Sequence, residues 1–336
     1  MRYACKGARS ADMAEWASQS FIPALLLLNM APKIESWFVT IRGGLANPFG
    51  GVQLIFELDG TIGNPAKVYP TLKQVHLGLF HDALSPEDSR IVDFLLASAP
   101  NAETLELYSS QSTILTKAQV PPRLTSMVLH DIYPDRSAMQ QMANLAAATL
   151  TKLCIYNDCT GWRVPPLMQQ LLIPLRRSRA ASTLKVLHID GAIMDLPVPD
   201  IMAGFPSLEL LGIRFDWLGR RMDSLRAMLK GCPRLRALLL TAADQITRQE
   251  MEGFIADLGS GNFRNPHLRR VVLIPREYRR GYIRPPRRIY WRNLKAAVPW
   301  PDDRKVDNAG IEWVLEADNT KKFETIVEEC QEALGI

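Results

Sequence analysis

Apolar residues recur along the chain in a six-residue pattern, L-x-x-L-x-L, whose first, fourth and sixth positions are apolar. Nine copies align, and in seven of them a proline stands two residues before the first apolar position. Because side chains alternate across a β-strand, the last two apolar residues of a copy point to the same face. The pattern therefore predicts nine short strands, with first apolar residues Ile34, Leu72, Ala102, Leu124, Leu150, Leu184, Leu208, Leu235 and Leu268.

The spacing between copies leaves room for a helix after most strands. One helix is predicted to begin at Ser85, where Pro86 and two acidic residues suit a first turn, and another to span 222–230. Leucine-rich repeats place this strand pattern in units of about 20–29 residues. We therefore predict an α/β fold, a leucine-rich-repeat solenoid (horseshoe) of about nine irregular strand–helix units, with a parallel sheet on its concave side and a mixed C-terminal cap.

Four segments are expected along the chain. Residues 1–33 are predicted to be an N-terminal helical cap, and residues 34–275 the solenoid. Residues 276–300 form a basic aromatic linker, and 301–336 an acidic cap with a strand at 310–316 and a helix at 321–334. A cap is expected because the end of a solenoid would otherwise expose its core.

The third, fifth and seventh positions of each copy are predicted to face outward. In copies two to six these positions carry a mixture of tyrosines and charged groups that suits protein recognition, although ordinary solvated strands would show the same residues. The candidate partner-binding residues are His76, Glu106, Tyr108, His130, Tyr156, His188 and Asp190.

The last three copies carry apolar residues at the outward positions instead, namely Leu210, Leu239, Val272 and Ile274. A bare apolar stripe is rarely left exposed on a protein surface. We expect the C-terminal segment, or a partner, to cover it.

Net charge is +5, from 40 basic and 35 acidic residues, but its distribution is uneven. Residues 276–295 are strongly basic and contain tyrosine and tryptophan, a combination that can bind nucleic acid. Neutralisation by the acidic residues of 301–336 in a cap, or an exposed linker, is the favoured interpretation, and binding of an acidic or nucleic-acid partner is the alternative. The candidate basic patch is Arg279, Arg280, Arg284, Arg287, Arg288 and Arg292.

No phosphate-binding, nucleophile-elbow or zinc-protease motif occurs, so neither an enzyme nor a cofactor is expected. His76 and His188 lie four copies apart, which places them about 20 Å from each other at the spacing of neighbouring strands. We therefore expect no metal site.

Five scattered cysteines do not form a disulfide framework and are expected to be reduced thiols. The longest apolar stretch, residues 21–31, is too short for a membrane span, and Asp12 and Glu15 before it do not suit a signal peptide. The sequence thus predicts a monomeric cytoplasmic or nuclear protein that does not bind membranes.

Several phrases of the sequence resemble the irregular leucine-rich repeats of fungal F-box-type proteins: LLLLNMAPKIESWFV (25–39), LLASAPNAETLEL (95–107), AGFPSLELLGI (203–213) and KGCPRLRALLL (230–240). In that family the repeats select a target, and an N-terminal F-box docks on the adaptor of a cullin-type ubiquitin ligase. The resemblance implies the substrate-recognition part of such a receptor. Residues 1–33 contain no L-P-x-E motif, so the F-box would have to be supplied upstream of Met1. A repeat scaffold unrelated to ubiquitin is the alternative.

Overall fold

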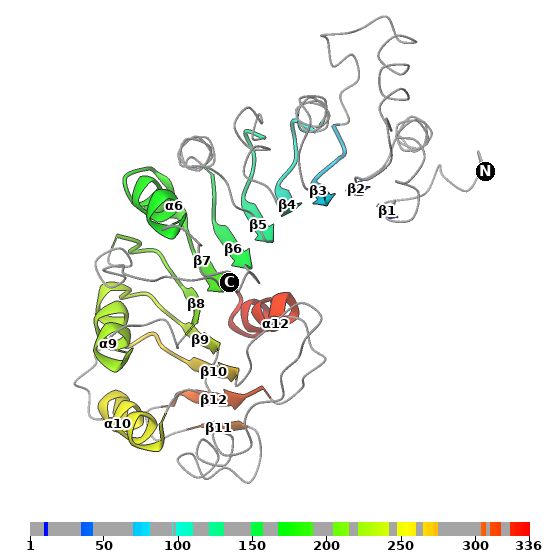
Figure 1. Cartoon of the computed structure of the whole chain (residues 1–336). Coiled ribbons are helices and arrows are strands. Elements are labelled where there is room, and N and C mark those ends of the chain that lie inside the picture. The colour runs from blue at the N-terminus through cyan, green and yellow to red at the C-terminus, as the bar shows by residue number, and fades with distance from the viewer. Residues whose placement is uncertain are drawn as a thin grey trace, which may run out of the picture. The chain divides into compact units, whose positions relative to one another are not determined.

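The computed structural model describes two compact parts of the chain, which are treated separately (Figure 1). The N-terminal module comprises residues 1–150 and the C-terminal module residues 151–336. The described residues are 10–12, 35–42, 70–80, 96, 99–109, 121–130, 149–156, 167–190, 204–214, 221–241, 247–259, 265–274, 304–306, 310–316 and 323–336.

The N-terminal module contains a parallel sheet whose strands are neighbours in chain order. The three residues of β1 belong to the segment predicted as a helical cap, and there they are strand instead; the rest of 1–33 lies outside the described residues. The strands are β1 (Ser10–Asp12), β2 (Ser36–Arg42), β3 (Gln74–Phe80), β4 (Thr104–Ser109) and β5 (Ser126–His130).

The C-terminal module continues the same arrangement with a second set of parallel strands. After β10 the sheet gains β12 in parallel, and β11 pairs antiparallel with the far side of β12. The strands are β6 (Lys152–Tyr156), β7 (Val186–Asp190), β8 (Leu210–Arg214), β9 (Ala237–Thr241), β10 (Arg270–Ile274), β11 (Arg304–Val306) and β12 (Glu312–Leu315).

All nine predicted strands are present, and each begins two residues after the first apolar residue of its copy. The register also aligns equivalent positions of neighbouring copies, as Ser36 with Gln74 and Leu210 with Ala237 show. A parallel sheet in chain order, with one repeat position facing the same position of the next copy, is the architecture of a leucine-rich-repeat solenoid. The predicted α/β fold class is therefore confirmed.

The recurring proline has a structural reason. The backbone N–H of Ala102 donates to the carbonyl of Ala99 (3.0 Å), and that of Leu235 to Cys232 (3.1 Å), which closes a turn before the strand. Pro100 and Pro233 occupy the second position of these turns, where a fixed φ is favoured and no backbone N–H is needed. The proline thus directs the chain from each connecting segment into the next strand.

A repeated backbone bond also aligns the strand starts. The Lys73 carbonyl accepts the N–H groups of both Glu103 (2.8 Å) and Thr104 (3.0 Å) of the next repeat. The Glu209 carbonyl does the same for Arg236 (2.7 Å) and Ala237 (3.0 Å). Because one acceptor holds two successive donors, a one-residue slip between neighbouring strands would break both bonds.

In the C-terminal module, α6, α9 and α10 lie on one face of the sheet (Figure 1). The helix α12 lies across the opposite face. The helix expected at 222–230 is confirmed as α9, whereas the segment expected to begin a helix at Ser85 lies outside the described residues. The helices are α6 (Leu167–Arg176), α7 (Ala180–Thr183), α9 (Arg221–Gly231), α10 (Arg248–Gly259) and α12 (Phe323–Leu334).

The core of the C-terminal module lies between the sheet and the helices on the face opposite α12, such as α9. Inward residues such as Leu211 and Leu238 are fully buried, as are Leu225 and Met228 of α9. Removing each such side chain from water stabilises the fold by about 2 kcal/mol. None of the described helices is long and apolar enough to cross a membrane.

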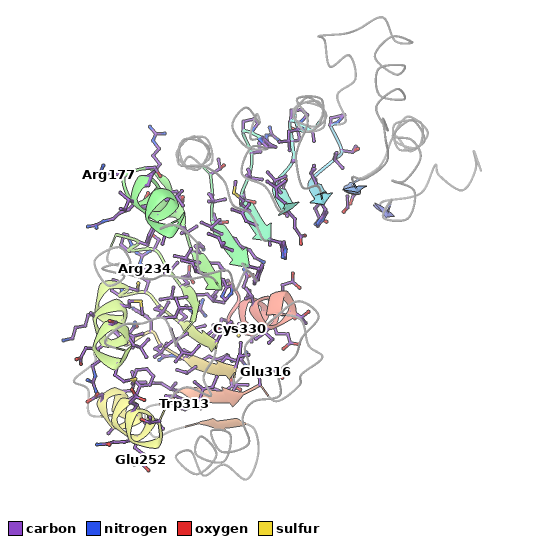
Figure 2. All side chains as sticks on the ribbon, in the orientation of Figure 1. Arg177, Arg234, Glu252, Trp313, Glu316 and Cys330 are labelled. Carbon is purple, nitrogen blue, oxygen red and sulfur yellow. The ribbon has the colours of Figure 1, made fainter. Side chains whose placement is uncertain are left out.

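The strand and helix expected in the acidic tail are present as β12 and α12, but β12 is more than part of a cap. It pairs with β10 in the repeat register and places Trp313 at an inward position, where its ring meets Phe254 of α10 edge to face at 5.9 Å. Figure 2 shows Trp313 toward α10 and Cys330 on α12. β12 therefore continues the repeat series as a further strand.

Candidate interaction surface

The outward face of β3, β4 and β5, called the N-terminal outward face, carries a cluster of three polar side chains. Glu106 lies directly opposite His76 in the register of β3 and β4. The carboxylate contacts both neighbours: Oε2 lies 2.5 Å from Nδ1 of His76, and Oε1 lies 2.9 Å from Nε2 of His130. We call His76, Glu106 and His130 the histidine–glutamate cluster.

The cluster geometry determines where the imidazole hydrogens are. An ionised carboxylate only accepts hydrogen bonds, so each contacting ring nitrogen must carry a hydrogen. His76 therefore donates from Nδ1 and His130 from Nε2. Opposite edges of the two rings are directed at a single carboxylate, which holds both rings in defined orientations.

The cluster lies at the edge of the core, because His76 and Glu106 are half-buried and His130 is buried. The side chains of His76, Glu106 and His130 retain 21%, 16% and 8% of their accessible surface. Hydrogen bonds to a charged group at such a site are stronger than those in water, and the side chains still reach the surface. The parts of the cluster that reach the surface are therefore the His76 ring and the Glu106 carboxylate.

Coordination chemistry receives no support from the described residues, among which no group of three His, Cys, Asp or Glu side chains could hold a metal ion. Glu106 instead uses both oxygens to bind the two rings. This arrangement suits recognition by hydrogen bonding more than ion binding.

The outward face of β8, β9 and β10, called the C-terminal outward face, carries the apolar stripe and is covered. Leu210 and Leu239 are completely buried, and Val272 and Ile274 expose at most 2% of their surface. Since the same strands bury their inward positions as well, β8, β9 and β10 are covered on both faces. The expected covering of the apolar stripe is confirmed.

The cover is the C-terminal helix α12. Arg236, just before β9, donates from Nη2 to the backbone carbonyl of Leu334 in the last turn of α12. Arg270 of β10 binds Glu312 of β12 (2.7 Å) and contacts the thiol of Cys330. Burial raises the pKa of that thiol. These contacts fasten the helix over the starts of β9 and β10.

The end of α12 is also structurally defined. Gly335 has a φ of 63°, a left-handed conformation that favours glycine. Its N–H donates to the carbonyl of Glu332 (3.2 Å), and the N–H of Ile336 donates to Gln331 (3.0 Å). This pair of bonds is the Schellman motif, which terminates helices and satisfies their last carbonyls.

His188 lies on the predicted outward face, but its side chain is fully buried. Burial lowers its pKa from 6.5 to about 3, so the ring is neutral at physiological pH. Its ring lies against Tyr156, with centroids 5.0 Å apart, and across Gly212 on the neighbouring strand. A Cβ at Gly212 would lie 2.0 Å from Nδ1 of His188, so only glycine fits beneath the ring. His188 is thus a packing residue and not part of an exposed surface.

The remaining candidates are described in part or not at all. Tyr156 of β6 is half-buried against His188, while the side chains of Tyr108 and Asp190 lie outside the described residues. The candidate basic patch between Arg279 and Arg292 lies wholly outside them. The structure therefore brings together His76, Glu106 and His130, whereas His188 belongs to the C-terminal module.

Part of this cluster can be predicted from the positions of its residues within the repeat. His76 and Glu106 both occupy the fifth position of adjacent copies, so the strand register makes them direct neighbours. His130 occupies the seventh position of the next copy, opposite Tyr108, and reaches Glu106 diagonally. Such diagonal contacts depend on side-chain length and conformation, which the repeat spacing does not reveal.

Comparison with known proteins gives structural similarity but no family. No protein-family model matches the chain, and no curated protein matches it. Among solved structures, human 5T4 (trophoblast glycoprotein) is similar, with 13% sequence identity and a TM-score of 0.32, over 72% of this chain and 69% of that chain. The fold assignment above comes from the strand order and register of the chain itself.

Proposed function

We propose that this chain is a monomeric protein-recognition module without enzymatic activity or cofactor, and that the N-terminal outward face binds its protein target. The observation that carries the proposal is the histidine–glutamate cluster, in which one half-buried carboxylate orients the half-buried ring of His76 and the buried ring of His130. Polar groups that are already oriented lose less conformational entropy on binding. The C-terminal outward face is occupied by α12, which leaves the N-terminal face as the better candidate.

The test is to compare captured proteins between two matched variants. Glu106→Gln keeps the side-chain shape but replaces an acceptor oxygen by an NH₂ group, which faces a ring N–H. Glu328→Gln makes the same chemical change on the exposed side of α12. Proteins captured from the source cells by wild type and Glu328→Gln, but not by Glu106→Gln, are the targets of the face.

Direct titration of such a target should show about a tenfold or larger loss of affinity for Glu106→Gln, the size of a moderate interface residue. Glu328→Gln should bind like wild type. Equal binding by all three proteins would remove the N-terminal outward face from the proposal.

A more specific role is also proposed, as the target-binding part of an F-box-like ubiquitin-ligase receptor. Its support is the sequence resemblance of the repeats alone. Recovery of a cullin and its adaptor with the captured target would establish that role. Their absence, with a reproducible target still bound, would favour a scaffold unrelated to ubiquitin. Either result leaves the test of the N-terminal outward face intact, because that test follows the target and not the adaptor.

The nucleic-acid alternative belongs to residues 276–295 and is supported by sequence alone. Binding through this segment should weaken steeply as salt rises and should be lost when its arginines are replaced. A cytoplasmic or nuclear location remains part of the proposal and is testable by imaging the tagged protein.

A further inference from the structure

The turns that lead into β7, β8, β9 and β10 form a strongly basic edge of the C-terminal module. We call residues 176–185, 204–209, 230–236 and 265–269 the strand-start edge. The edge contains eight Lys or Arg side chains and a single carboxylate, that of Glu209. The eight basic residues are Arg176, Arg177, Arg179, Lys185, Lys230, Arg234, Arg236 and Arg269.

The edge is continuous in space. Backbone hydrogen bonds join Lys185 to Glu209, Glu209 to Arg236, and Arg236 to Arg269 across successive strand starts. The side chain of Arg176 at the end of α6 lies against Gly204, in the turn before β8. Neighbouring strand starts are about 5 Å apart, which is less than the Debye length of about 8 Å at physiological salt. Their charges therefore act together on an approaching ion.

Within the edge Glu209 is the only carboxylate, and from outside it the last turn of the acidic helix α12 contacts Arg236. Glu209 forms ion pairs with Lys185 and Arg236, both at 3.3 Å. The side chains of Arg177, Arg179 and Arg234 are exposed, and Arg177 and Arg234 are labelled in Figure 2. Arg176 and Lys230 lie in the last turns of α6 and α9, where a positive charge interacts favourably with the C-terminal end of the helix dipole. Arg179 and Arg234 lie outside those turns, so this effect does not explain them.

The equivalent turns of the N-terminal module have no such excess. Their described charged residues are Glu35, Lys73, Glu103 and Arg123, two of each sign. Both modules use the same repeat pattern and the same strand-start hydrogen bonds. The basic excess is therefore a property of this edge and not a requirement of the repeat.

We propose that the strand-start edge of the C-terminal module binds an acidic segment of a partner protein, one that carries several Asp or Glu side chains. Guanidinium groups bind carboxylates through paired hydrogen bonds, so exposed arginines suit such a partner. The four strand starts span about 15 Å, the length of four or five residues of an extended peptide. The exposed residues of the edge include no Phe, Tyr or Trp, and His267 is its one exposed aromatic ring, so nucleic-acid bases have little stacking surface there.

The experiment uses the whole 336-residue chain and a fluorescent octaglutamate peptide, with binding followed by anisotropy. The test variant is Arg179→Glu with Arg234→Glu, and the matched control is Lys73→Glu with Arg123→Glu. Both pairs are exposed and change the net charge equally. We expect the test variant to weaken binding about tenfold or more, and the control to change it less than about threefold. Circular dichroism verifies that both remain folded.

Three results would overturn the proposal. The first is no binding of octaglutamate by wild type at low salt. The second is an equal loss in both variants, which would show that net charge alone attracts the peptide. The third is tighter binding of single-stranded oligothymidine than of octaglutamate, lost in the same test variant, which would make the edge a nucleic-acid surface.

Discussion

The two modules use the fifth position of the repeat for different purposes. In the N-terminal module this position carries His76 and Glu106, which are paired and partly exposed. In the C-terminal module it carries Leu239 and Val272, which are buried beneath α12. The strand register is the same in both. The comparison shows that the repeat fixes where a side chain points, while the residue type differs between a covered face and a partly exposed one.

The largest effect is expected from truncating a buried outward residue. Leu239→Ala should lower the free energy of unfolding by about 2–5 kcal/mol, because α12 and the sheet would enclose a cavity. The matched change at the same repeat position of the N-terminal module is Val128→Ala, which should cost about 1 kcal/mol or less because Val128 is only partly buried. Denaturant unfolding monitored by circular dichroism measures both. Similar losses would mean that the two outward faces are equally buried.

Acidification should destabilise the C-terminal module through His188. Its pKa in the folded protein is about 3, against 6.5 for a solvent-exposed histidine, so between these values the unfolded chain binds the additional proton. Stability is therefore lost as pH falls below about 6.5, by about 1.4 kcal/mol per pH unit and about 3 kcal/mol at pH 4.5. The control is His188→Leu, which should remove this part of the slope. Parallel pH profiles for the two proteins would refute the burial of a neutral ring.

Adding one methyl group beneath the His188 ring should lower the free energy of unfolding by less than the Leu239 truncation and the acidification above. Gly212→Ala places a carbon 2.0 Å from Nδ1 of His188, and overpacking of this kind costs about 1–3 kcal/mol. The double variant with His188→Ala should recover much of the loss, because the clash is removed. A double-mutant cycle on unfolding free energies gives the coupling. Strictly additive losses would place the ring elsewhere.

The smallest effect on stability is expected in the N-terminal module. Glu106→Gln should change the free energy of unfolding by about 1 kcal/mol or less, since the cluster is near the surface and the amide retains one acceptor oxygen. Target affinity should fall about tenfold in the same variant. A stability loss as large as that of Leu239→Ala would make the cluster a structural element and not a recognition site.

The strand positions could be predicted because the pattern is local. The first apolar residue of each copy places the strand start, and β9 beginning at Ala237 after Leu235 is one instance. β12 was expected as a strand of a separate cap, because Gly310 stands where the first leucine would be and only Trp313 and Leu315 mark the pattern. β1 has Ala11 at the fourth position, too small to indicate a core strand.

The sites were harder to predict because they depend on contacts between copies. The apolar residues Leu210 and Leu239 correctly indicated a cover, since exposed leucines at alternating positions are unfavourable. His188 was indistinguishable from His76 by repeat position, and its burial depends on neighbours from other copies, the ring of Tyr156 and the space above Gly212. The arginines of the strand-start edge are scattered between 176 and 269 in the sequence, and the turns bring them together.

The doubly accepting carbonyl at each strand start has a consequence for how such a chain can change over time. From β2 to β10, strand starts are separated by as few as 22 and as many as 38 residues, yet the hydrogen bonds between described neighbours are alike. Insertions and deletions are therefore absorbed in the connecting segments and leave the rows of side chains aligned. A lineage can lengthen or shorten a connection, or exchange one outward residue, without disturbing the others. Each copy can therefore change its outward residues independently, while the spacing and alignment of the strands stay the same.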